Sequence, residues 1–509
     1  MRSHFYKISL VLITILTLGA VTQYLAEKYV VGKIKQLSVE QDIELQYDDI
    51  SINLFLLKAS VKNVSVVIRN NSNKHTLSLF ASAVYLHKFS LIDFLFEKKV
   101  VLKNISVDHP KIKVFKQKSI AKSSVGENST PIIVENFNIK NGSVEYYDKS
   151  LKDSLNFKIE NFDLKLSEVV FPKPISNNTA LPIAYKDISS TIFGLTKKVG
   201  EFELLRIEEV LLDKSNILAL QLKLETKYGK QELSKFLKSE KDHVSLTIPK
   251  FEIKEFFFNS LDSTNIIGAQ YIFIQQAKLN LFRDKAVADN AKYKSLYSEK
   301  IRNLRFKINF LKVVFENSNF NYEQLSKNSQ ISGNLYFTNI NASASFSNLE
   351  HKKNQIQFSA KGDFMDKAQV ILETDFNSFT SDAFTASGSV KKFEARTIQK
   401  FLEKTQRIRL EGRIDEMYFN LSGNNTHSNG TVKMKYSDLK LEVLKKDRIQ
   451  VNTLLTAVGN LFLKNEEENS KEYQYGEIDI KRDQTKSFFN FLWISLRDGL
   501  KDVLINKNN

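Results

Sequence analysis

The seven histidines are where metal binding or proton transfer would begin in this chain, and their spacing supports neither chemistry. None has a second histidine at the spacing of a metal-binding pair, and the His-Glu-x-x-His motif is absent. The chain also lacks the glycine-rich loops that bind phosphates and the Gly-x-Ser-x-Gly elbow of serine hydrolases. We therefore expect no metal and no cofactor. The histidines are His4, His75, His87, His109, His243, His351 and His427.

The carboxylates give no stronger indication of catalysis. Glu208-Glu209 and the acidic run 466–468 lie in polar stretches, where adjacent acids are usually solvated. Asp108-His109 precedes Pro110 in a predicted turn, where a structural role is favoured over a catalytic one. Because the carboxylate pair of a glycosidase leaves no local signature, a polysaccharide-acting enzyme remains a third hypothesis. The residues favour a protein that is not an enzyme.

Cysteine usage and net charge exclude further classes. The chain has no cysteine, which excludes disulfides, thiol catalysis and Cys-ligated metal clusters. Its net charge is +16, but the basic residues are spread along predicted strands, as at Lys111 and Lys113. That placement is typical of a solvated strand face, and no RNA-binding or helix-turn-helix pattern is visible. We expect no nucleic-acid partner.

Apolar and polar residues alternate with a period of two through most of the chain. The stretch Asn216–Glu225 is the clearest example. In a strand, its alternate leucines would all lie on one face and its polar residues on the other. The leucines are Leu218, Leu220, Leu222 and Leu224.

The scarcity of turn residues indicates how these strands combine. The 509 residues include only 17 glycines and 6 prolines, whereas compact β-sandwiches need turns rich in both. A strand with one apolar face must cover it with another sheet, with helices or with lipid, and the predicted helices are few and short. The expected fold is mainly β: an N-terminal transmembrane helix followed by an elongated, curled antiparallel β-sheet groove with a few short amphipathic helices.

The N-terminal segment predicts a membrane anchor. Arg2 and Lys7 precede an apolar run from Ile8 to Thr22, which orients the N-terminus toward the cytoplasm. An uncleaved single-pass anchor is favoured over a cleaved signal peptide, because Ala20-Val21-Thr22 is a weak cleavage site. The rest of the chain would lie on the far side of the membrane. The anchor residues are Ile8, Leu10, Val11, Leu12, Ile13, Ile15, Leu16 and Leu18.

Two local patterns concern the strands themselves. Asn141-Gly142 between two alternating runs predicts a β-hairpin turn, because both residues tolerate positive φ. The stretch 136–147 around it has an echo at 317–323, which suggests a loose repeat. The expected regions are a membrane anchor (1–30), an N-terminal β region (31–116), a linker (117–130), a middle β-groove region (131–283), a polar connector (284–300), a C-terminal β region (301–445) and C-terminal helices with a capping strand (446–509).

The C-terminal stretch Thr485–Leu504 predicts an amphipathic helix. Two interpretations of its apolar face stay open. It can cap the end of the sheet, which is the favoured reading, or dock on a membrane or partner. The residues of that face are Phe488, Phe489, Leu492, Trp493, Leu496 and Leu500.

Several segments follow one another in a characteristic order: Leu77–Leu86 with the predicted helix Ser90–Lys98, Val100–Val114, Ile133–Tyr146, Gly430–Leu439 and Gly476–Asn490. Their order after the N-terminal anchor resembles the AsmA-like family, and the last two segments resemble the ending of Bacteroidetes-type members. The family implies an anchor in the bacterial inner membrane and a long periplasmic β-structure. Its larger relatives, TamB, YhdP-like and bridge-like lipid transfer proteins, carry phospholipid in an apolar groove.

Two functional hypotheses follow. The first is a periplasmic groove that binds or transfers phospholipid, with the inner membrane and an outer-membrane or envelope protein as further partners. The second is a scaffold for outer-membrane protein biogenesis or for targeting to the membrane, with dry β-domains. The residues expected to line the groove are Leu218, Leu220, Leu222, Leu224, Val244, Leu246 and Ile248.

Overall fold

The computed structural model describes residues 24, 28, 32, 43–54, 56–69, 75–89, 100–116, 132–148, 155–171, 184–261, 264–327, 331–349, 355–377, 381–445, 451 and 472–505. The predicted anchor 8–22, the predicted helix Ser90–Lys98 and the linker lie outside these residues. No helix in the described part is long and apolar enough to cross a membrane. Two compact units are present: unit 1 is 1–198 with 206–214, and unit 2 is 199–205 with 215–509.

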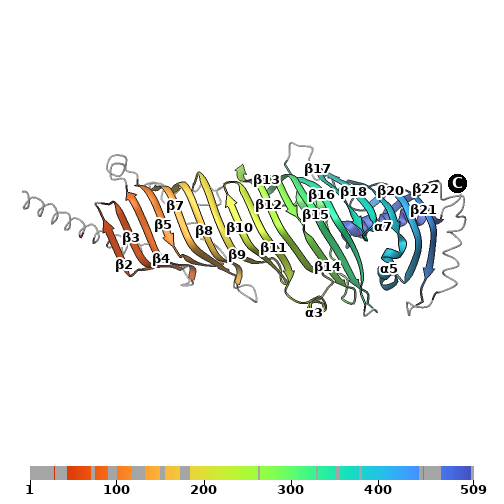
Figure 1. Ribbon diagram of the computed structural model, residues 1–509, viewed down its shortest axis with the longest axis horizontal. Helices are drawn as coiled ribbons and strands as arrows, with labels where there is room; N and C mark the ends of the chain where they lie inside the picture. Colours follow the sequence, from red (N-terminus) through yellow and green to blue (C-terminus); the bar gives the residue numbers. More distant parts are fainter. Residues whose placement is uncertain are drawn as a thin grey trace, which may run out of the picture. The chain divides into compact units, whose positions relative to one another are not determined.

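Unit 1 is built from β-strands, as the alternating pattern predicts. Its strands lie side by side in Figure 1, in red to yellow. They are β1 (Ile43–Gln46), β2 (Asp49–Asn53), β3 (Lys58–Arg69), β4 (His75–Phe89), β5 (Val100–Asp108), β6 (Lys111–Phe115), β7 (Ile132–Tyr147), β8 (Leu155–Phe171) and β9 (Asp187–Lys198), with β10 (Glu203–Asp213) pairing with β9.

Unit 2 contains both strands and helices. Its strands are β11 (Asn216–Thr226), β12 (His243–Leu261), β13 (Thr264–Gln275), β14 (Lys278–Asp284), β15 (Lys307–Leu325), β16 (Gly333–Ser347), β17 (Gln355–Phe364), β18 (Ala368–Asn377), β19 (Phe384–Glu394), β20 (Ile408–Gly423), β21 (His427–Val443) and β22 (Gln474–Lys481). Its helices are α3 (Lys230–Ser234), α4 (Tyr297–Arg302), the 3-10 turn η1 (Ala395–Ile398), α5 (Gln399–Thr405) and α7 (Phe488–Ile505).

The strands form a mixed sheet, so the prediction of an antiparallel sheet is wrong for the strand pairs that run parallel. In unit 1 the long strand β4 pairs antiparallel with both β5 and β6, and these two strands both run parallel to β7. Unit 2 repeats the arrangement, with β12 antiparallel to β13 and β14, which both run parallel to β15. A parallel pair needs a crossover connection, which alternation along single strands does not reveal.

The two four-strand arrangements, β4–β7 in unit 1 and β12–β15 in unit 2, share a backbone feature between their two shorter strands. His109 lies between β5 and β6 with a φ of 50°, and Gln276 lies between β13 and β14 with a φ of 53°. Their amides donate to the carbonyls of Lys140 and Glu316 at 2.8 and 2.9 Å. The positive-φ residues Asn141 and Asn317 directly follow those acceptors in β7 and β15. The sequence echo between 136–147 and 317–323 therefore marks equivalent strands.

The predicted hairpin at Asn141-Gly142 is wrong. Both residues lie inside the continuous strand β7. Asn141 does adopt a positive φ, of 51°, but it produces an irregularity in the pairing with β8 rather than a turn. Gly142 is needed for another reason: a Cβ atom there would lie 2.4 Å from the ring of Phe162.

Candidate functional site

One side of the unit 2 sheet carries a continuous apolar surface, which we call the apolar face. Directly paired residues share a face, and Leu222 pairs with Ile248 while Leu224 pairs with Leu246. The same surface continues through Ile274 of β13 and Val313 of β15. Its buried centre is Ile248, Ile274, Ala277, Val313 and Ala344, with Leu222, Leu246, Phe251, Ile272, Phe310, Phe315, Phe346 and Phe358 packed against it.

The four predicted groove leucines of β11 do not all lie on this face. Gln221 has a φ of 53°, which interrupts the alternation between Leu220 and Leu222. Leu220 pairs with Lys250, and Leu218 pairs with Glu252. The structure therefore brings Leu222 and Leu224 together with Leu246 and Ile248, and it places Leu218 and Leu220 with charged partners on the opposite, polar face.

Val244 stands at the end of the apolar face. The hydroxyl of Thr226 donates to the Val244 carbonyl at 3.0 Å and accepts from the Val244 amide at 2.9 Å. Across β12, Val244 also pairs with Leu281 of β14. Val244 thus follows Leu246 along the same side of β12, next to a threonine rather than a leucine, and it does not belong to the cluster around Ile248.

The helices α4, η1 and α7 contribute residues to the other end of the apolar face. A second cluster joins Phe376, Leu421 and Val432 of β18, β20 and β21 with Phe491 of α7. Phe346 packs against both clusters, so the two share one side of the sheet. The described helices pack on β14 to β22: α7 on β21 and β22, α5 on β15, β16 and β20, α4 on β18 and α3 on β14. The cluster that begins at Leu222 contains no helical residue.

The predicted C-terminal helix is present, and it caps the sheet, as the favoured interpretation holds. Phe488 and Leu492 are buried against the sheet, and Leu496 and Leu500 pack at its margin. Phe489 and Trp493 are instead 54% and 50% exposed, so the apolar stripe is broader than the surface it buries. Sequence reasoning missed Phe491, which is 1% exposed, because it was not assigned to the stripe.

A charged pair lies where β14 meets the segment before β12. Arg283 binds Asp242 through two hydrogen bonds of 2.7 and 2.6 Å. Burial alone would lower the pKa of the Arg283 guanidinium, but its bonds to Asp242 outweigh burial and raise it. Burial raises the pKa of the neighbouring Tyr322 phenol to about 12. Both groups keep their ordinary charge states at neutral pH.

An ion cluster fixes the start of α7. Glu240, whose side chain is 2% exposed, accepts a hydrogen bond of 2.7 Å from Lys285. Lys486, two residues before α7, lies 4.0 Å from Glu240 and donates to Asp289 at 2.9 Å. The hydrogen bond from Lys486 lowers the pKa of Asp289. A buried carboxylate is costly to leave unpaired, and Glu240 lies within 4.0 Å of Lys285, Arg283 and Lys486, so this cluster favours the observed position of the helix start.

Two backbone amides of β22 form hydrogen bonds with side chains of α7. The backbone N–H groups of Glu477 and Asp479 donate to the carboxylates of Asp502 and Asp498 at 2.8 and 3.1 Å. Gly499 allows the helix to approach, because a Cβ atom there would lie 2.6 Å from Val432. Two of the donors with which β22 would recruit another strand are thus already satisfied.

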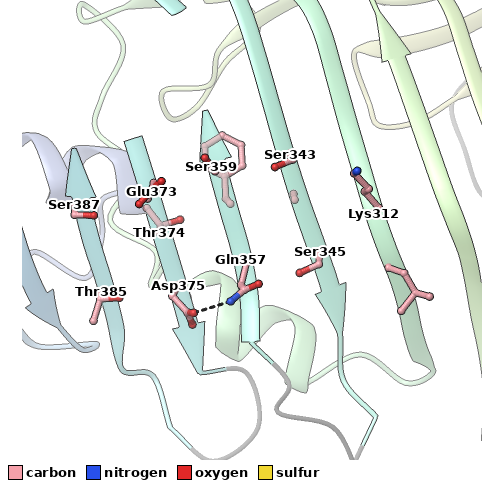
Figure 2. Close-up of a pocket in the computed structure, with 13 residues that line it drawn as sticks. Lys312, Ser343, Ser345, Gln357, Ser359, Glu373, Thr374, Asp375, Thr385 and Ser387 are labelled. Atoms are coloured by element: carbon pink, nitrogen blue, oxygen red, sulfur yellow. Dashed lines mark hydrogen bonds between the residues drawn. The ribbon is translucent and has the colours of Figure 1, made fainter. Parts of the chain in front are cut away.

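The polar face offers a depression of about 480 Å³, shown in Figure 2. Gln357 donates to Asp375 at 3.2 Å across neighbouring strands. No histidine lines the depression, and the described residues hold no group of three His, Cys, Asp or Glu that could bind a metal. The polar residues labelled around it include Ser343, Ser345, Gln357, Ser359, Glu373, Asp375, Thr385 and Ser387.

Unit 1 has an apolar face of its own. Leu102 pairs with Val134, which pairs with Val169, and all three are buried. The alternation shifts here too, because Leu166 belongs to the same cluster as Val169 and Glu168 between them has a φ of 48°. Both units therefore combine one apolar face with a change of phase inside their strands.

The cluster around Ile248 extends over neighbouring strands of unit 2, from Leu222 of β11 to Phe358 of β17. Because β13 and β14 both lie between β12 and β15, the strands from β11 to β17 occupy six positions in the sheet. At the usual strand separation these positions span about 24 Å. No protein-family model matches this chain, and no curated protein matches it.

Proposed function

We propose that the apolar face of unit 2 binds the acyl chains of phospholipids. One observation carries the proposal: among the residues that the structure describes, the cluster formed by Leu222, Leu246, Ile248 and Ile274 contains no helical residue, whereas α4, η1 and α7 contribute to the cluster at the other end of the face. The centre of the cluster is buried by its neighbours, and the residues packed against it are only partly buried, so apolar area remains there for a ligand. An acyl chain is apolar, long and flexible, and it fits such a surface without specific polar groups.

The energetics suit transfer as well as binding. Each buried CH₂ group contributes about 0.8 kcal/mol, similar to what an acyl chain loses on leaving a bilayer. Movement between a bilayer and the apolar face would then be nearly balanced in free energy. Together with the resemblance to AsmA-like proteins, this supports an inner-membrane-anchored periplasmic protein that binds or transfers phospholipid between envelope membranes without enzymatic chemistry.

The test compares two neighbouring leucines. Leu222→Asp places a carboxylate on the apolar face, whereas Leu220→Asp places it beside Lys250 on the polar face. The full-length chain and both variants are purified in mild detergent, transferred to detergent-free amphipol, and examined by native mass spectrometry and lipid extraction. We expect phospholipid with the unmodified chain and with Leu220→Asp, and its loss with Leu222→Asp.

The controls separate binding from folding. Circular dichroism and the urea midpoint show whether Leu222→Asp remains folded, and Leu222→Asn provides a milder variant if it does not. Equal lipid retention in both variants would contradict the proposal. A stable chain that never carries lipid would favour the alternative, a scaffold for outer-membrane protein biogenesis.

A further inference from the structure

Three aromatic rings gather just beyond the end of β11 in unit 2. Tyr228 stacks on Phe236 with ring centroids 4.3 Å apart, and Phe202 lies 6.1 Å from Tyr228. Phe236 is 50% exposed. In the neighbouring helix α3, Leu233 is 1% exposed, and Nε2 of His243 lies 2.9 Å from the Tyr228 carbonyl oxygen.

Lysines surround these rings. The segment 227–241 contains five lysines and no arginine. Lys230 pairs with Glu323, and Lys241 pairs with Glu203 at 2.5 Å. The remaining three are exposed, and no carboxylate in the described part of the chain forms an ion pair with them. They are Lys227, Lys235 and Lys238, and together with Phe202, Tyr228 and Phe236 we call them the aromatic–lysine rim.

We propose that the aromatic–lysine rim docks on the surface of an anionic lipid bilayer. Half-exposed aromatic rings lie favourably at the level of lipid head groups, where one part of the ring is apolar and another is wet. Lysines add attraction to anionic lipids, and their long stems let the ammonium groups reach the phosphates. The rim combines both features over a short stretch of chain.

The composition favours a membrane over a protein partner. The centres of protein interfaces are enriched in arginine and depleted in lysine, and all the basic residues of this rim are lysines. Lysine binds as a point charge without directional geometry, which suits a fluid array of phosphates. The rim is also continuous with the apolar face, since Thr226, two residues before Tyr228, pairs with Val244 at the end of that face. Docking does not depend on what the apolar face holds, so this inference goes beyond lipid binding there.

The experiment uses the absence of cysteine. Phe236→Cys in the full-length chain is labelled with the environment-sensitive fluorophore NBD and mixed with phosphatidylcholine vesicles, with or without phosphatidylglycerol. Ile371→Cys is the matched control, because Ile371 is an exposed apolar residue on the polar face, 46% exposed. We expect a blue shift and an intensity gain at 236 only with phosphatidylglycerol, reduced by salt, and no change at 371.

A set of charge variants tests the lysines. Replacing Lys227, Lys235 and Lys238 by glutamine should lower the affinity for phosphatidylglycerol vesicles, measured by titration of the label at 236, by about fivefold per lysine, or about 100-fold together. The same change at Lys312, Lys361 and Lys391 removes equal charge from the polar face and should leave the response intact.

Three outcomes would overturn the inference. They are an equal response at 236 with and without phosphatidylglycerol, an equal response of the 371 label, or no effect of the three glutamines. Lipid extraction from the same samples reports separately on the apolar face. Loss of docking with lipid retained, or the reverse, distinguishes failure of this inference from failure of the proposed function.

Discussion

A single residue in the left-handed region changes which side chains share a face. Gln221 interrupts the alternation of β11 opposite Pro249 of β12, and the pairing resumes in the same register on both sides. Leu222 therefore lies on the apolar face, and Leu220, only two residues earlier, lies on the polar face. Because both strands shift together, the apolar face stays continuous across them.

The first prediction concerns the backbone at Gln221. A non-glycine residue at positive φ costs on the order of 1 kcal/mol, and a β-branched residue costs more. Gln221→Gly should raise the urea midpoint of unfolding, and Gln221→Val should lower it by an amount equivalent to about 1 kcal/mol. Lys223→Val, at an exposed strand position of normal φ, serves as the control and should change little.

If Gln221→Val and Lys223→Val behaved alike, the phase change would not depend on this residue.

The signal for the phase change is present in the sequence. Apolar residues of β12 fall at Leu246 and Ile248, then at Phe251 and Ile253. The interval of three between Ile248 and Phe251 marks the shift. A strict period of two overlooks it, which is why the prediction put Leu218 and Leu220 on the same side of β11 as Leu222 and Leu224, whereas the structure separates the two pairs.

At the scale of elements, local pattern predicted strands and helices better than their connections. The helix at the C-terminus and its buried residues Phe488 and Leu492 follow from amphipathic spacing. The parallel pairing of β15 with β13 and β14 could not be predicted, because it depends on the crossover 285–306 rather than on any strand. Asn141-Gly142 shows the same limit: its φ preference was evident, but its place inside β7 was set by pairing with neighbours.

The second prediction concerns the carboxylates of α7 that accept from β22. Replacing Asp498 and Asp502 together by alanine leaves two strand amides without partners and opens them to another chain. The variant should unfold at lower urea, by an amount equivalent to about 1 kcal/mol per lost bond. It should also self-associate in light scattering. Lys501→Ala, on the same helix, should do neither, and a monomeric double variant would show that these bonds do not protect β22.

The third prediction concerns acid. The pKa of Asp289 is lowered by its hydrogen bond from Lys486, so its contribution to stability is present above the unfolded value near 4 and is lost as pH falls below it. Trp493 is the only tryptophan and lies on α7, so its fluorescence anisotropy reports on the helix. We expect anisotropy to fall on acidification below about pH 4.

Asp289→Asn should lower the anisotropy already at neutral pH and reduce the further change on acidification. Glu201→Gln removes an exposed carboxylate elsewhere in unit 2 and should keep the acid response of the unmodified chain. An acid response unaltered by Asp289→Asn would assign it to other carboxylates, among which Glu323 and Glu403 also have lowered pKa values.

At the scale of the whole molecule, composition and pattern predicted a mainly β chain, and the structure confirms it. The sequence could not show which part of the apolar surface is covered within the chain. In unit 2 the cluster around Phe376 and Phe491 is covered by α7, whereas the cluster around Ile248 has no helical residue in the part of the chain that the structure describes. The proposal of lipid binding depends on that difference, and the predicted anchor at 8–22 lies outside the described residues.

The measurement that tests lipid binding most directly is quenching of tryptophan by brominated acyl chains. In a Trp493→Phe background, tryptophan is placed at Leu222 or at Leu220, and the full-length chain is reconstituted with phospholipid brominated on its acyl chains. Acyl chains on the apolar face should quench Trp at 222 strongly and leave Trp at 220 bright. Equal quenching at the two positions, or none at 222, would contradict the account.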